Sequence, residues 1–510
     1  MNKIKKLCFV TILSFSVCIQ SCSYIQRDGV KSAETDVSVN DETKDKSVAL
    51  GALKPLVKRQ SKNGPMAPVA TSDYIEEKEM YQPQPVENFN TEEYSRIYEN
   101  AFLDVKKNPL STFSIDVDSA SYSNIRRFIN NKTIPPKDAV RIEEMINYFT
   151  YNYSEPTGKD PFSINTEISD CPWNKDAKLV KIGLQGKKMP TKNLPTSNLV
   201  FLIDVSGSMD SPDKLPLLKS AFKMLINQLR ENDHVAIVVY AGAAGLVLPS
   251  TPGNKKEEIE SALDKLQAGG STAGGEGLKL AYKIAQENFI EEGNNRIILA
   301  TDGDFNVGPS SDGEMIRLIE DERKQGTFLT VLGFGMGNYK DSKMEQIADK
   351  GNGNYAYIDN TAEAKKVLVS ELGATLFTIA KDVKLQIEFN PAQVKAYRLI
   401  GYENRMLKNE DFNNDQKDAG ELGAGHSVTA LYEIVPQGKE ISLPEVDKLK
   451  YQETNVKANS YHSKEIMTVK FRYKAPNSDV SKLIVKTIEN KELKLNQTSD
   501  DFRFSAAVAG

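Results

Sequence analysis

The chain has 510 residues, with 65 lysines and arginines against 70 acidic residues and a net charge of −5. This is about three to four times the usual ~150 residues of a domain, so we expect several folding units with connectors. An apolar fraction of 39% and a charged fraction of 26% exclude collagen-like, wholly disordered and polytopic membrane proteins. Because no long basic run occurs, we expect no nucleic-acid partner.

Residues 1–21 have the pattern of a secretory signal peptide, because three lysines precede an apolar stretch too short to span a bilayer. The stretch ends in Ile19-Gln20-Ser21-Cys22, which resembles the lipobox of bacterial lipoproteins. The resemblance implies lipidation of Cys22; the alternative is an ordinary cleaved signal with a chance cysteine. We expect a lipid-anchored protein of the cell envelope. In the best-known sorting rule, an Asp directly after the lipidated Cys retains a lipoprotein in the inner membrane. Residue 23 is Ser, so we favour the outer membrane of a Gram-negative bacterium.

Residues 22–92 are polar and charge-mixed with Pro and Gly interruptions, a composition that predicts a disordered tether. Cys171 is the one cysteine outside the signal region, so no intrachain disulfide is expected once Cys22 is lipidated. We interpret Cys171 as a buried structural thiol.

The region 93–190 is expected to form an α+β flanking domain. A strand is predicted over Phe113–Val117, and a helix is predicted to begin near Pro135-Pro136. The helix carries an apolar stripe at helical spacing, formed by Ile142, Met145, Ile146 and Phe149. Alternating patterns at 162–165 and 179–184 predict further strands.

The region 195–373 alternates apolar runs with helical patterns, which predicts an α/β fold with a doubly wound, mostly parallel, Rossmann-like sheet. The four runs are 199–203, 235–240, 296–300 and 327–332. From 380 to 510 the apolar residues recur with period two, which predicts a β-rich C-terminal domain, in our interpretation a sandwich. Residues 504–510 have the pattern of an apolar helix that is cut off as it begins.

Three predicted strand ends carry oxygen-rich turns, and ligands of open α/β sheets bind beyond the carboxyl ends of strands. The first turn holds Asp204, Ser206 and Ser208, the second holds Thr272 in a glycine-rich loop, and the third holds Asp302. Carboxylates and hydroxyls that converge from separate loops make a hard, oxygen-only cage. We expect Mg²⁺ in this cage, with Mn²⁺ and Ca²⁺ as alternatives.

The order of these elements resembles the metal-ion-dependent adhesion site (MIDAS) of von Willebrand factor type A (VWA) domains. The resemblance implies that Ser206, Ser208 and Thr272 ligate the ion through hydroxyls, while Asp204 and Asp302 act mainly through water and hydrogen bonds. Neutral hydroxyls leave much of the ion's charge uncompensated. An acidic residue of a protein partner is therefore expected to complete the coordination.

The flanks extend the resemblance to about residues 96–510. Segments 98–102, 111–118 and 140–149 are similar to the N-terminal flank of a family of bacterial VWA lipoproteins, and 389–391, 397–405 and 418–426 are similar to its C-terminal domain. That domain continues in the family past the point where residue 510 stands. The chain is expected to be either truncated or naturally short there.

Enzymatic alternatives are weaker. Asp116-Val117-Asp118 could form a phosphatase-type D-x-D pair, but the other motifs of that family do not follow in order, so we favour a structural cap or a minor ion contact. The turn 333–337 lacks the dinucleotide glycine spacing, and the loop 270–275 lacks the P-loop lysine, so no nucleotide is expected.

Two further sets of residues also argue against a catalytic or calcium site. His234, His426 and His462 are scattered and suggest no catalytic set. Asp411, Asn413 and Asp415 have calcium-loop spacing without its Gly and Glu, so a solvated loop is favoured.

We therefore predict no enzyme and no catalytic residue. The predicted function is a lipid-anchored envelope protein that binds a protein partner through the metal of its VWA domain. The alternative is a structural or assembly lipoprotein, in which the metal only stabilises the fold and the flanking β domains make the contacts.

Overall fold

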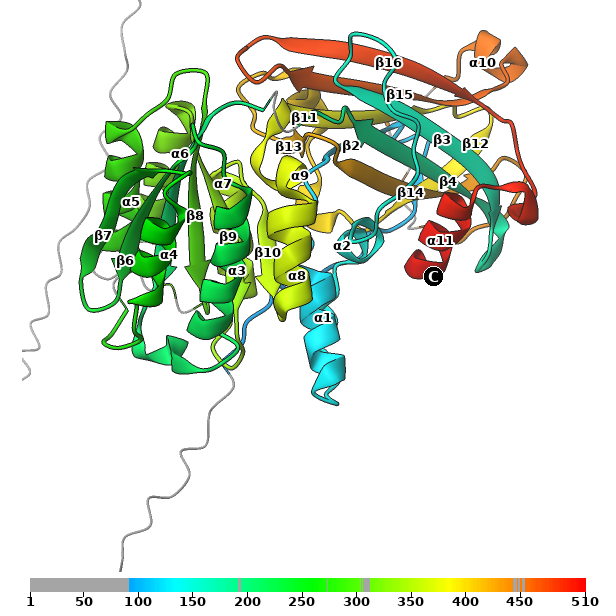
Figure 1. Ribbon diagram of the computed structural model, residues 1–510. Coiled ribbons are helices and arrows are strands. Elements are labelled where there is room, and N and C mark those ends of the chain that lie inside the picture. Colours follow the sequence, from blue (N-terminus) through cyan, green and yellow to red (C-terminus); the bar gives the residue numbers. More distant parts are fainter. Residues whose placement is uncertain are drawn as a thin grey trace, which may run out of the picture. The chain divides into compact units, whose positions relative to one another are not determined.

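The computed structural model describes residues 91–190, 194–272, 274–303, 305, 312–443, 447, 450–451 and 455–510, which all belong to one compact unit, Gln84–Gly510 (Figure 1). The predicted signal peptide, Cys22 and nearly all of the predicted tether lie outside the described residues. Among the described helices, none combines the length and the apolar run that a membrane crossing requires.

A six-stranded sheet forms the centre of the predicted α/β region (Figure 1). Its strands are β5 Ser197–Asp204, β6 His234–Tyr240, β7 Ala244–Pro252, β8 Asn294–Thr301, β9 Thr327–Phe334 and β10 Tyr355–Ile358. They are ordered β10-β9-β8-β5-β6-β7, and only the edge pair β6 and β7 is antiparallel. The mostly parallel sheet predicted from the sequence is confirmed.

Helices pack on both faces of this sheet. They are α3 Leu215–Gln228, α4 Lys256–Asp264, α5 Gly274–Glu287, α6 Asp312–Lys324, α7 Asp341–Lys350, α8 Thr361–Lys365, the π-helix η4 Lys366–Ser370 and α9 Leu372–Leu376. Successive side chains of β5 pack into the hydrophobic clusters on opposite faces of the sheet, because side chains along a strand point alternately to its two faces. Phe201 stacks on Phe222 of α3 at 4.3 Å between ring centroids, whereas Leu202 belongs to the cluster that contains Leu278 of α5. This two-sided burial explains why the strands are nearly continuous apolar runs.

The remaining strands form two sheets. They are β1 Leu103–Asp104, β2 Leu110–Ser114, β3 Phe162–Cys171, β4 Asn174–Gly186, β11 Thr378–Phe389, β12 Val394–Ile400, β13 Gly420–Gly423, β14 Ser427–Pro436, β15 Glu465–Lys474 and β16 Ser481–Glu489. One sheet has the order β1-β12-β14-β4-β3, and the other has β13-β11-β15-β16 with β2 also paired to β11. Apolar side chains from both sheets share one buried cluster, as in a sandwich.

The two predicted flanks contribute strands to the same sheets. Leu184 of β4 lies opposite Val428 of β14, and Phe113 of β2 lies opposite Leu385 of β11. The predicted β-rich character of the C-terminal region is confirmed. The period-two pattern did not reveal that strands from 93–190 complete this sandwich, because the pattern gives the buried face of a strand but not its partner.

The other helical elements of the described residues are α1 Ala120–Asn130, η1 Lys137–Ala139, α2 Ile142–Asn147, η3 Gly207–Asp210, η5 Glu403–Arg405, η6 Asn409–Asn413, α10 Ala458–His462, η7 Leu495–Gln497 and α11 Asp500–Ala509. The predicted helix starts later than Pro135-Pro136, because the short 3₁₀ turn η1 comes first. Its predicted stripe is only partly helical, since Phe149 lies beyond the end of α2. The predicted C-terminal helix already begins at Asp500, capped by the Ser499 hydroxyl, which accepts a hydrogen bond from Phe502 N at 3.1 Å.

Candidate metal centre

Asp204 is the last residue of β5, and both oxygens of its carboxylate accept hydrogen bonds. Oδ1 accepts a hydrogen bond from Ser206 N at 2.9 Å, and Oδ2 accepts one from Tyr240 Oη and one from Thr301 Oγ1, each at 3.1 Å. The residue is fully buried. Burial raises the pKa of Asp204 to about 6, although the hydrogen bonds from Ser206 act in the opposite direction. A buried carboxylate that is fixed in this way is pre-organised for a cation.

Ser206 and Ser208 present hydroxyls side by side at the start of the 3₁₀ turn η3 Gly207–Asp210. Their Oγ atoms lie 3.0 Å apart. Ser206 is buried, whereas Ser208 is exposed. The pair therefore offers two adjacent neutral oxygens, one of them at the surface.

The glycine-rich loop is bonded to this turn through its backbone. Gly207 N donates to Gly270 O at 3.0 Å, and Gly269 N donates to Val205 O at 2.8 Å. Gly270 has a φ of +86°, which a residue with a side chain adopts only with strain. Thr272 follows two residues later and is half-buried. The loop thus brings Thr272 to the same edge of the sheet as the two serines.

Asp302 follows β8 and is fully buried. Its Oδ2 accepts hydrogen bonds from Lys214 Nζ at 2.8 Å and from Asn338 Nδ2 at 3.1 Å. Burial alone raises the pKa of Asp302, but the Lys214 ammonium together with hydrogen bonds from Ser208 and Asn338 outweighs it, and the pKa is lowered. Asp302 is therefore ionised at neutral pH. Lys214 and Asn338 are residues that sequence analysis missed, since neither has a spacing that marks it.

The donor set fits a hard divalent cation. Hydrogen bonds link Asp204 to Ser206, Ser206 to Ser208, and Ser208 to Asp302, so four of the five predicted residues form one contiguous set. Every donor is an oxygen, the ligand type that Mg²⁺, Mn²⁺ and Ca²⁺ share. The assignment of these residues as metal ligands stays a prediction.

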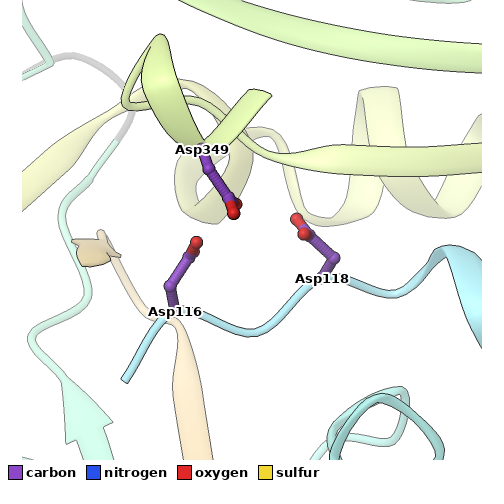
Figure 2. Close-up of side chains that lie close together, drawn as sticks. All are labelled: Asp116, Asp118 and Asp349. Atoms are coloured by element: carbon purple, nitrogen blue, oxygen red, sulfur yellow. The ribbon is translucent and has the colours of Figure 1, made fainter. Parts of the chain in front are cut away.

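A second group of acidic residues also lies close enough together to hold a metal ion. Oxygens of Asp116, Asp118 and Asp349 lie within 4.8 Å of one another (Figure 2), as do oxygens of Asp118, Glu144 and Glu345. Asp116 and Asp118 follow β2, and Asp349 belongs to α7. This group therefore joins the N-terminal flank to the α/β region.

Two buried arginines occupy this group. Arg405, in the 3₁₀ turn η5 Glu403–Arg405, forms ion pairs with Asp118 at 3.0 Å, Glu345 at 3.2 Å, Asp116 at 3.4 Å and also Asp349. Arg141 likewise pairs with Glu144 and Asp341. The other carboxylate oxygen of Asp118, Oδ1, accepts a hydrogen bond from Tyr355 N at 2.7 Å. We interpret the group as an ion-pair network between segments, which agrees with the structural-cap alternative for the D-x-D motif.

The other motifs singled out in the sequence serve local structure. Asp415 Oδ2 accepts a hydrogen bond from Ser481 N at 3.3 Å, and Asn413 Oδ1 accepts one from Arg472 at 2.9 Å, so both side chains bond this loop to strands β15 and β16. The turn after β9 contains two glycines with positive φ, Gly335 at +69° and Gly337 at +97°. It is a tight turn, as expected. Cys171 is buried, and burial raises the pKa of its thiol to about 11.

Comparison with known families divides the chain into three matched regions. A model described as von Willebrand factor type A domain matches residues 198–371, and one described as von Willebrand factor matches 88–181. A third, described as uncharacterized protein YfbK, C-terminal, matches 374–510.

The chain is also similar to individual proteins and solved structures. Uncharacterized protein YfbK of Escherichia coli (strain K12) is 47% identical over 431 residues, covering 83% of this chain and 74% of that protein. Uncharacterized protein sll0103 of Synechocystis is 33% identical over 169 residues, covering 33% and 39%. Among solved structures, a von Willebrand factor type A protein from Catenulispora acidiphila has 17% identity, coverages of 68% and 75%, and a TM-score of 0.39. BatB from Bacteroides thetaiotaomicron has 22% identity, coverages of 34% and 97%, and a TM-score of 0.30. The chain therefore belongs to the YfbK family of bacterial proteins with a von Willebrand factor type A domain.

Proposed function

We propose that this chain is a lipid-anchored protein of the cell envelope that binds a protein partner through a divalent cation at the carboxyl edge of its central sheet. The VWA domain points to protein–protein interaction or adhesion. In our proposal Cys22 carries the lipid, Mg²⁺ is the usual ion, and the partner supplies an acidic residue. The outer membrane is the proposed location, and no catalytic residue is assigned.

The observation that carries this proposal is the unequal exposure of the candidate ligands. Asp204 and Asp302 are fully buried, whereas Ser208 is an exposed residue. An ion held here would be enclosed on its carboxylate side and open to solvent on its hydroxyl side. Because the ligands on the open side are uncharged hydroxyls, an anionic group that approaches from solvent would be attracted to the ion and would meet no negative ligand on that side.

One observation favours the alternative structural role. The N-terminal segment is bonded to the turn that follows β9: Thr91 N donates to Gly337 O at 2.8 Å, and Glu92 accepts a hydrogen bond from Gly337 N at 2.9 Å. The same turn carries Asn338, which bonds Asp302. In this alternative, metal binding would stabilise the junction between the flank and the sheet, and the β strands would make the contacts with other proteins.

Affinity capture from envelope extracts separates the two roles. The chain is immobilised in Mg²⁺ or in EDTA, as wild type, as Ser208→Ala and as Ser220→Ala, which removes an exposed hydroxyl from α3 away from the site. We expect a partner that is retained in Mg²⁺ by wild type and Ser220→Ala, and that is lost in EDTA and with Ser208→Ala. Equal retention by all three proteins in both Mg²⁺ and EDTA would favour contacts through the β strands instead.

A further inference from the structure

A lysine side chain lies inside the candidate cation site. Lys214 Nζ lies 2.8 Å from Asp302 Oδ2 and 3.4 Å from Asn338 Oδ1, and the side chain is only 9% exposed. A positive charge beside the predicted ligands of a cation is unexpected, because like charges repel strongly where water is excluded. The position of this ammonium therefore needs a functional explanation.

The surrounding backbone encloses the lysine. Lys214 N donates to Ser211 O at 3.0 Å, and Lys214 O accepts a hydrogen bond from Leu218 N at 2.8 Å, which fixes the main chain at the start of α3. The turn after β9 packs against the stem: a Cβ built on Gly335 would overlap Lys214 Cε. The stem of Lys214 is therefore packed against this turn next to Asp302.

The charges of the site depend on this residue. Asp204 and Asp302 supply two negative charges, and Lys214 offsets one of them. A divalent ion then leaves the site with one excess positive charge, which a single carboxylate from outside would neutralise. Without Lys214, the ion alone would neutralise the site, and an added carboxylate would leave a negative excess.

We propose that Lys214 couples the two binding events: by offsetting Asp302 it weakens binding of the cation alone and makes that binding cooperative with a carboxylate. Lys214 is a positioning residue: it sets the charge of the site through Asp302 and does not ligate the ion. This inference rests on the proposed function and specifies how the same site is regulated. The partner's acidic group is then a condition for stable metal occupancy.

Calorimetric titration of Mn²⁺ into the full chain tests this coupling. Titrations are run in sodium acetate, as the carboxylate probe, and in sodium chloride of equal ionic strength. The variants are Lys214→Gln, which keeps a hydrogen-bonding head without the charge, and Lys214→Met. Lys223→Met is the matched control, because it removes a partly exposed lysine from the same helix, where that lysine pairs with Asp264 at 2.7 Å.

We expect Lys214→Gln to bind Mn²⁺ in chloride at least about tenfold more tightly than wild type, since a repulsive charge has been removed. Acetate should tighten Mn²⁺ binding to wild type and to Lys223→Met, and it should leave the Lys214 variants unchanged or weaker. Lys214→Met should behave like Lys214→Gln.

Two results would overturn the inference, and they are distinguishable. If both Lys214 variants unfold cooperatively but bind Mn²⁺ no more tightly than wild type, or show the same acetate effect, Lys214 is only a structural ion pair. The proposed metal site would survive that result. If wild type and variants all fail to bind Mn²⁺ with and without acetate, the proposed function fails together with the inference.

Discussion

Replacement of Arg405 by Met should weaken the junction between the α/β region and the sandwich more than any exposed ion pair does. The single guanidinium faces four carboxylates, from Asp116, Asp118, Glu345 and Asp349. Its side chain is 8% exposed, and that of Asp118 is fully buried. Methionine fills a similar volume but leaves these acids without their shared cation.

Removal of one partner from a buried ion pair costs about 3–5 kcal/mol, so a loss of this size is expected at pH 8. Burial already raises the pKa of Asp118 and of Asp349 well above the usual aspartate value, with Arg405 opposing the rise. Without Arg405 the pKa of both groups rises further. A carboxyl whose pKa is raised by folding destabilises the protein when pH is high, so the deficit of the variant should shrink as pH falls from 8 to 5.

Urea unfolding of wild type and variant, followed by circular dichroism at pH 8 and pH 5, measures both effects. Arg503→Met is the control, because Arg503 pairs with the highly exposed Asp500 and such pairs contribute about 0–1 kcal/mol. The reasoning is refuted if Arg405→Met loses no more stability than the control, or if its deficit is the same at both pH values.

Three other predictions concern single buried side chains. Burial raises the pKa of Glu144 to about 7 although Arg141 opposes it, so this group should lower the free energy of unfolding as pH rises from about 4.5 to about 7, and Glu144→Gln should make the urea midpoint less dependent on pH across this range. Cys171 should react with a thiol reagent only at the rate of unfolding, and rapid labelling of the native chain would contradict its burial. Phe222→Ala should cost about 3–5 kcal/mol in urea unfolding, because the fully buried ring stacks on Phe201; a cost below about 1 kcal/mol would contradict this packing.

The central sheet could be predicted because its signals are local. Each parallel strand is a short apolar run, and the side chains of β5 are buried on both faces. Asp204 and Asp302 stand directly after such runs, so their meeting at one edge follows from the parallel arrangement. The same logic could not find Lys214 or Asn338, because their contacts with Asp302 depend on how two turns fold over the sheet.

In the sandwich, local sequence patterns did not predict the exact strand bounds or the strand partners. The predicted strand Phe113–Val117 is observed as Leu110–Ser114, because the chain after Ser114 turns Asp116 and Asp118 toward Arg405. The pairing of β2 with β11 joins segments more than 250 residues apart, and no periodicity within one strand specifies such a partner. Long-range electrostatic pairs and strand partners are therefore the parts that needed the three-dimensional structure.

The melting temperature of the purified chain in EDTA and in graded Mg²⁺, Mn²⁺ and Ca²⁺ tests the central claim most directly. A ligand at 100 times its Kd adds about 2.7 kcal/mol, which corresponds to roughly 5–10 °C where the α/β region of about 180 residues unfolds by itself and to roughly 3 °C where the whole unit Gln84–Gly510 unfolds together. We predict this rise for wild type and for Ser220→Ala, and its loss in Ser208→Ala. The same melting temperature in EDTA and in millimolar amounts of every ion, with carboxylate present, would contradict a metal centre at Asp204 and Asp302.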